Sequence, residues 1–189
     1  MGKKKKQKAK KKQIVAKANL QELQESRDGG QIALRGYSYQ FLYSCNLILS
    51  SDTDTVFTLE GIEDIDAIKY SDDSKTITHI QLKYSTQRQD ASFMDSVLQN
   101  YLEAYLIDKN RHFKLVYDFS IAAGNLSKLF SGNLDKNSKE FWKTKIDNIK
   151  KKTSLWNWSN FDFEDFIQRL SFKNVKKDFP GSCRRCQMG

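Results

Sequence analysis

The stretch Phe57–Ser85 constrains the fold of this chain more than any other, because apolar and polar residues alternate along two neighbouring segments. Alternation with a period of two is typical of half-buried strands. Between the segments, Ser71–Ser74 (SDDS) has the composition of a turn. We therefore predict a hairpin with strands at 64–70 and 77–84, preceded by a strand at 55–60.

Helical periodicity flanks these strands. Apolar residues recur every three or four positions over 31–50, which predicts a helix that starts after Asp28-Gly29-Gly30 ends a short helical segment at 14–25. A second helix is predicted at 93–107 and a fourth strand at 113–121. The order αβββαβ, in which a crossover helix joins the hairpin strands to the last strand, indicates an α/β fold with a mixed sheet.

The rest of the chain completes one domain with a helical C-terminal part. We predict helices at 126–130, 138–151 and 161–170 from their apolar spacing. No internal repeat is visible, and the length suits a single core. We expect a disordered lysine-rich arm at 1–29, a folded domain at 30–178 and an unstructured tail at 179–189.

The positive charge of the chain is concentrated in the arm. Of the net charge of +9, nearly all comes from eight lysines within residues 1–13, where no acid occurs. Such a run either binds nucleic-acid phosphates through counterion release or simply keeps the chain soluble. The candidate nucleic-acid-binding residues are Lys3, Lys4, Lys5, Lys6, Lys8, Lys10, Lys11 and Lys12.

Several classes of protein are excluded or disfavoured by composition. No run of roughly 18 apolar residues is present, so we expect no membrane span. The basic start lacks the apolar segment of a secretory signal. Three cysteines, two of them in a single Cys183-x-x-Cys186 motif without partner histidines, indicate neither a disulfide framework nor a strong zinc site. We therefore expect a cytoplasmic protein.

Acids, an amide and a lysine come together on the predicted hairpin. Strand residues two apart share a face, so Asp64 joins Asp66 on one strand, and Gln81 joins Lys83 on the other. We expect Asp66 beside Gln81 and Lys83, with Asp64 or Glu60 near the same edge. Carboxylate and amide oxygens suit Mg²⁺, and a nearby lysine stabilises charge at phosphorus, as phosphodiester hydrolysis requires. The alternative is a solvated face of ordinary acid–lysine pairs.

The three segments Gly36–Gln40, Glu60–Asp66 and Ile80–Lys83, in this order, resemble a known family. They are similar to the PD-(D/E)xK nuclease superfamily, which has the restriction-endonuclease-like fold, with Gln81 at the position of the second acid. Within it they resemble the nuclease domain of CD-NTase-associated anti-phage endonucleases. The resemblance covers about 30–121.

The resemblance implies a metal-dependent endonuclease that cleaves double-stranded DNA in bacterial anti-phage defence, with Mg²⁺ or Mn²⁺ as cofactor. Asp66 is the first candidate for the metal-binding acid because apolar residues follow it, and Asp64 is its rival because Glu63-Asp64 matches a Glu-Asp pair of the family. The implied metal-site residues are Asp66, Asp64, Gln81 and Glu60, and the implied catalytic residues are Asp66, Gln81, Lys83, Asp64 and Gln40.

The implied partners are DNA, further copies of the chain, since two sites are needed to cut both strands, and a separate sensor or ATPase subunit. The alternative is a non-catalytic nucleic-acid-binding or interaction subunit that uses the lysine arm. Two other features keep two interpretations each: His79 borders the site or is packed, and Trp142, Trp156 and Trp158 stack on bases or belong to the core.

Overall fold

The computed structural model describes residues 20–72 and 74–175, with side chains described from residue 33 onward. The chain divides into two compact units, Met1–Tyr39 and Gln40–Gly189. In the first, residues 20–39 are helical; the second carries the sheet and the candidate site. The elements are α2 (Leu20–Ser50), β1 (Thr55–Leu59), β2 (Ile65–Ser71), β3 (Ser74–Tyr84), a 3₁₀ turn (Ala91–Phe93), α3 (Met94–Ile107), β4 (His112–Asp118), α4 (Asn125–Phe130), α5 (Lys136–Lys152), α6 (Phe163–Gln168) and β5 (Leu170–Asn174).

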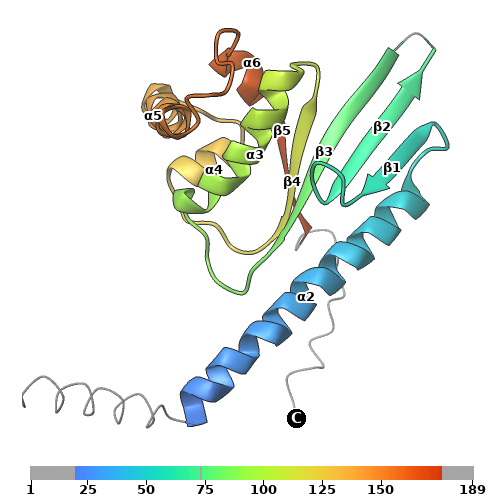
Figure 1. Ribbon diagram of the computed structural model, residues 1–189, viewed down its shortest axis with the longest axis vertical. Helices are drawn as coiled ribbons and strands as arrows, with labels where there is room; N and C mark the ends of the chain where they lie inside the picture. The colour runs from blue at the N-terminus through green and yellow to red at the C-terminus, as the bar shows by residue number, and fades with distance from the viewer. Residues whose placement is uncertain (1–19, 73, 176–189) are drawn as a thin grey trace, which may run out of the picture. The chain divides into compact units, whose positions relative to one another are not determined.

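The five strands form one mixed sheet in the order β1-β2-β3-β4-β5 (Figure 1). The pairs β1–β2 and β2–β3 are antiparallel, whereas β3–β4 and β4–β5 are parallel. The helix α3 crosses over between β3 and β4, as parallel neighbours require. The α/β fold and the order αβββαβ predicted from the sequence are therefore confirmed.

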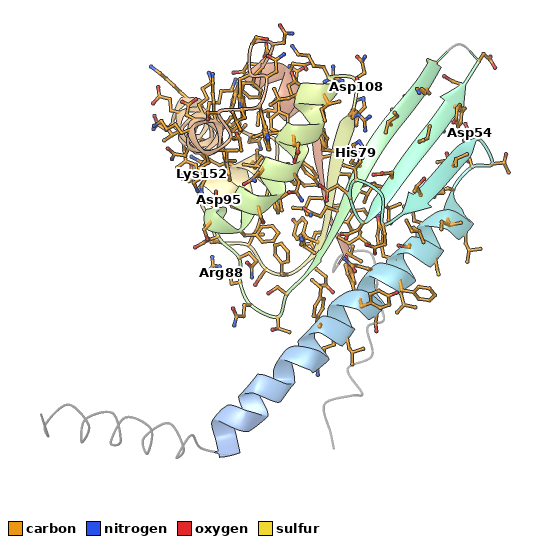
Figure 2. All side chains as sticks on the ribbon, in the orientation of Figure 1. Asp54, His79, Arg88, Asp95, Asp108 and Lys152 are labelled. Atoms are coloured by element: carbon orange, nitrogen blue, oxygen red, sulfur yellow. The ribbon has the colours of Figure 1, made fainter. Side chains whose placement is uncertain are left out.

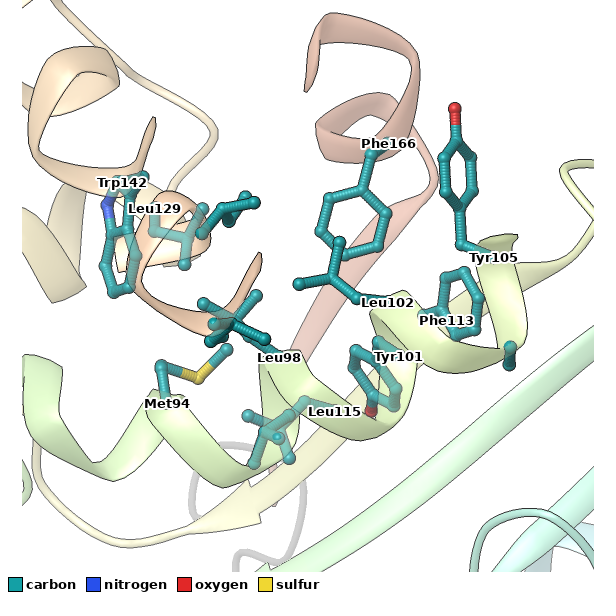
Figure 3. Packing of buried hydrophobic residues seen from close by; sticks show 14 of the residues in the cluster. Met94, Leu98, Tyr101, Leu102, Tyr105, Phe113, Leu115, Leu129, Trp142 and Phe166 are labelled. Carbon is teal, nitrogen blue, oxygen red and sulfur yellow. The ribbon is translucent and has the colours of Figure 1, made fainter. Parts of the chain in front are cut away.

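The main core lies between the sheet and the helices α3 to α6, which gather on one face of the sheet (Figure 1). Figure 3 shows Leu98 and Leu102 of α3 packed towards Phe113 and Leu115 of β4, with Trp142 of α5 closing the far side. Trp158 is buried in the same cluster, so the core interpretation is confirmed for both tryptophans. Burying large aromatic side chains contributes much of the stability of a domain this size.

One predicted helix break was wrong, and one strand was not predicted. The helix α2 runs without a break through Asp28-Gly29-Gly30, because glycine lowers helix propensity without forbidding helical backbone angles. The strand β5 was not predicted: it follows α6, the helix predicted at 161–170, and its Phe172 stacks on Phe130 with ring centroids 4.3 Å apart. Its five residues are too few for periodicity to separate a strand from a continuing helix.

Some expectations fall on residues that are not described. Residues 1–19, which include every lysine of the arm, and residues 176–189, which include Cys183 and Cys186, lie outside the described part of the chain. The limits of the arm, domain and tail therefore stay predictions. Within the described ranges, no helix combines the length and apolarity needed to cross a bilayer.

Candidate metal and phosphate site at the fork of β2 and β3

The site begins where the β2–β3 ladder ends. The last paired residues are Ile65 and Ile80, and beyond them the two strands part. There the Asp64 carboxylate continues the ladder: its Oδ2 accepts a hydrogen bond from the Leu82 backbone N–H at 2.6 Å. Its Oδ1 accepts a bond from Gln40 Nε2 at 2.9 Å, so that α2, β2 and β3 meet on one carboxylate. Such bonds fix the orientation of a carboxylate.

Glu63 is the acid that the sequence analysis did not single out, and it is only 7% exposed. The pKa of Glu63 is raised to about 7, chiefly by burial and then by the neighbouring Asp64 carboxylate, while the Lys83 ammonium and a hydrogen bond with the Asn100 side chain act in the opposite direction. Its Oε1 is buried and finds no hydrogen-bond partner among the described residues. Glu63 is therefore a buried acid that lies next to both a carboxylate and an ammonium group.

Gln81 contributes a second buried oxygen to the same region. The residue is 5% exposed, and its Oε1 has no hydrogen-bond partner within the described ranges. Gln81 pairs with Leu115 of the parallel strand β4 and so faces the helices, as Lys83 two positions on does. The buried Tyr101 of α3 lies beside this region: its hydroxyl donates to the Lys114 carbonyl at 3.0 Å, and burial, followed by the Glu63 charge, raises its pKa.

These residues fit a hard divalent cation. Among the described residues, no group of three or more His, Cys, Asp or Glu side chains forms a metal cluster, so a site here depends on two acids and an amide. Two carboxylates and one amide oxygen match Mg²⁺, which keeps several of its waters. A cation would satisfy the unpaired oxygens of Glu63 and Gln81, and its charge would offset the carboxylates that raise the pKa of Glu63.

Asp66 lies opposite a different residue of β3 from the one we expected. It pairs with His79 and not with Gln81, so the predicted position beside Gln81 and Lys83 is wrong. Its Oδ1 lies 2.6 Å from His79 Nδ1, and its Oδ2 accepts a bond from the Ile62 N–H at 2.9 Å. The metal role predicted for Asp66 stays a prediction, and the geometry favours Asp64 and Glu63.

Among the described residues, no hydrogen bond joins Glu60 or His79 to the unpaired oxygens of Glu63 and Gln81. Glu60 is exposed in the turn between β1 and β2, with a left-handed backbone (φ 53°), and in the described part of the chain no hydrogen bond or ion pair joins its carboxylate to the site. His79 is 1% exposed and stacks on Phe113, so it is packed within the domain (Figure 2).

Comparison with known proteins yields one solved structure. No family model matches the chain, and no curated protein matches it. The matching structure is that of the Moraxella osloensis Cap4 SAVED/CARF-domain containing receptor, with 15% sequence identity and a TM-score of 0.42. The match covers 74% of this chain and 32% of that chain, so the present chain spans about a third of the length of the receptor.

Proposed function

We propose that the chain is a metal-dependent phosphodiester hydrolase that cleaves DNA. The observation that supports it is the grouping, at one fork of the sheet, of Glu63, Asp64 and Gln81 with the Lys83 ammonium. Hydrolysis of a phosphodiester requires oxygen ligands for a hard metal ion and a positively charged side chain that can bind the phosphate. The acids and the amide would supply the ligands, and Lys83 would supply the positive charge.

The acids and the amide have the role of holding the cation. Glu63 Oε1 and Gln81 Oε1 are buried acceptors that have no hydrogen-bond partner among the described residues, and the neighbouring Asp64 is oriented by Gln40 and by the Leu82 N–H. A bound Mg²⁺ or Mn²⁺ would supply Lewis acidity and a water of lowered pKa. Because Gln40 and the Leu82 N–H both donate to Asp64, its carboxylate is already oriented before a ligand binds.

Lys83 has the role of receiving the substrate. Its ammonium lies close enough to Glu63 to lower the pKa of that carboxyl, which places a positive charge next to the proposed cation site. A lysine in this position binds a non-bridging phosphate oxygen and stabilises the negative charge that develops during attack by water. The leaving oxygen takes its proton from solvent in this scheme.

The substrate and setting follow from the resemblance of the three sequence segments to anti-phage endonucleases. We propose double-stranded DNA as substrate, a role as effector in bacterial defence, and assembly of two or more copies, since one site cuts one strand at a time. A separate sensor or ATPase subunit would then control activity. The lysine-rich arm would add affinity for DNA without sequence preference.

Cleavage of supercoiled plasmid DNA by the full chain tests the proposed function. With Mg²⁺ or Mn²⁺ we expect nicked and linear products, and with EDTA none. Asp64→Asn, which weakens a metal ligand at almost unchanged size, should reduce the rate at least about 100-fold. Asp72→Asn, at an exposed position in the β2–β3 turn, is the matched control and should cleave as the wild type does.

A non-catalytic DNA-binding subunit gives a different result in the same assay. It would retain plasmid in a mobility shift with or without EDTA, produce no cleavage with either metal, and lose most of its affinity when residues 1–13 are removed. That outcome would overturn the proposed hydrolase.

A further inference from the structure

A chain of polar contacts, buried at His79, leads from the end of α3 to the turn that precedes the site. Asp66 Oδ1 contacts His79 Nδ1 at 2.6 Å, and His79 Nε2 contacts Arg111 Nη1 at 2.8 Å. Arg111 Nε forms an ion pair with Asp108 at 3.4 Å. The side chains of His79 and Asp66 are 1% and 13% exposed, so little solvent competes with the contact between them, whereas those of Arg111 and Asp108 are 20% and 37% exposed. Figure 2 labels His79 on β3 and Asp108 at the end of α3.

The direction of each hydrogen bond follows from the guanidinium. Arginine only donates, so His79 Nε2 must accept from Arg111 and cannot carry a proton. The imidazole proton is therefore on Nδ1, which donates to Asp66. One end of the ring is fixed by Arg111 so that the other always presents an N–H to Asp66, in the way that outer contacts orient histidine and carboxylate groups in metal sites.

The far oxygen of Asp66 holds the turn between β1 and β2. Its Oδ2 accepts the Ile62 N–H at 2.9 Å. The same carboxylate packs so closely on Gly61 that a Cβ at this position would overlap Oδ2. Glu60, before it, has a left-handed backbone, a conformation that is unfavourable for a non-glycine residue and needs support from its surroundings. Glu63 is the next residue after Ile62.

We propose that Asp66, His79 and Arg111 are positioning residues that hold the turn at 60–62, so that the Glu63 carboxylate faces Asp64 and Gln81. Asp66 then acts on the cation through Glu63 and is not itself a ligand. The proposal rests on the proposed function for the role of Glu63, whereas the hold on the turn stands on the contacts above.

Three substitutions of histidine in the full chain test the proposal. His79→Leu removes the donor to Asp66, and His79→Asn keeps an N–H donor at the position of Nδ1 while losing the contact to Arg111. The matched control is His112→Leu at an exposed histidine of β4. Two readouts are used besides cleavage: hydrogen exchange at the Ile62 amide, and the Kd for Mn²⁺ from calorimetry.

We expect His79→Leu to speed exchange at Ile62 about tenfold and to weaken Mn²⁺ binding about tenfold, the lower end of the effect of outer contacts in metal sites. His79→Asn should restore both to within about threefold of the wild type. If His79→Leu does not fold, Arg111→Met replaces it, with the same direction expected because the ring loses its fixed tautomer. Thermal unfolding of each variant separates these changes from loss of the fold.

The readouts distinguish failure of this proposal from failure of the proposed function. Unchanged exchange at Ile62 in His79→Leu or Arg111→Met overturns the positioning role. Equal loss of Mn²⁺ affinity in His79→Leu and His79→Asn also overturns it. The proposal requires that an N–H donor to Asp66 restores binding, and asparagine keeps such a donor. If the wild-type chain binds no Mn²⁺, the proposed function is wrong. Hydrogen exchange at Ile62 still decides whether Asp66, His79 and Arg111 hold the turn.

Discussion

Replacing Lys83 with methionine will reduce DNA cleavage by about 10²–10³-fold while leaving the fold and the affinity for Mn²⁺ nearly unchanged. Methionine keeps the length and the apolar stem but removes the ammonium next to Glu63. The Lys83 ammonium stabilises the negative charge that develops on the scissile phosphate during attack more than it stabilises the bound substrate. Its loss should therefore lower kcat far more than it raises KM. Single-turnover cleavage of a labelled duplex gives both quantities.

Lys75→Met is the matched control, because Lys75 lies on the same strand β3 but at its exposed end. It should cleave at the wild-type rate. Should Lys83→Met retain full cleavage, or should Lys75→Met lose as much, the role given to Lys83 is wrong.

Glu63→Gln is expected to make the metal-free protein more stable at pH 8 and to abolish its stabilisation by Mg²⁺. Glutamine is almost isosteric and neutral, so it removes a buried charge that the Asp64 carboxylate opposes. The pKa of Glu63 is raised from 4.5 to about 7, so the folded state binds this proton more tightly than the unfolded chain does. By linkage, the free energy of unfolding of the wild type falls as the pH rises from about 4.5 to about 7.

The gain from Glu63→Gln should therefore be absent below about pH 4.5, grow across that window, and reach about 2 kcal/mol at pH 8. Urea unfolding at a series of pH values without metal measures it. Added Mg²⁺ should then stabilise the wild type and not the variant, since only the wild type offers the carboxylate.

Glu103→Gln, at an exposed position of α3, provides the comparison and should change neither the pH dependence nor the response to Mg²⁺. A Glu63→Gln variant that still gains stability from Mg²⁺ as the wild type does would show that Glu63 is not a ligand.

The strands and their order were predictable because period-two patterning fixes which side chains share a face. The same rule explains why Asp66 was predicted beside Gln81, two residues from its actual partner His79. A shift of two residues keeps every side chain on its face, so the sequence could not decide whether Asp64 or Asp66 stands opposite Gln81. That choice depends on where the ladder ends, at Ile65, and hence on the whole β1–β2 turn.

The buried state of Glu63 could not be seen in the sequence for a related reason. An acid in a polar turn usually lies in solvent, whereas Glu63 is buried and lies beside Asn100 and Tyr101, which belong to a helix much later in the chain. The one available signal was its place in the Glu63-Asp64 pair. His79 and Arg111 likewise meet only through the crossover between β3 and β4.

The strand β5 bears on where the chain could be cut to obtain a working fragment. It pairs in parallel with β4 from Phe113 to Tyr117, and the Phe113 N–H donates to the Arg169 carbonyl just before it. A fragment that stopped after β4 would leave that strand with unpaired backbone groups and uncover the phenylalanines beneath α6, a surface prone to aggregate. The shortest piece expected to fold by itself therefore extends through Asn174, and the αβββαβ segment is not an independent module.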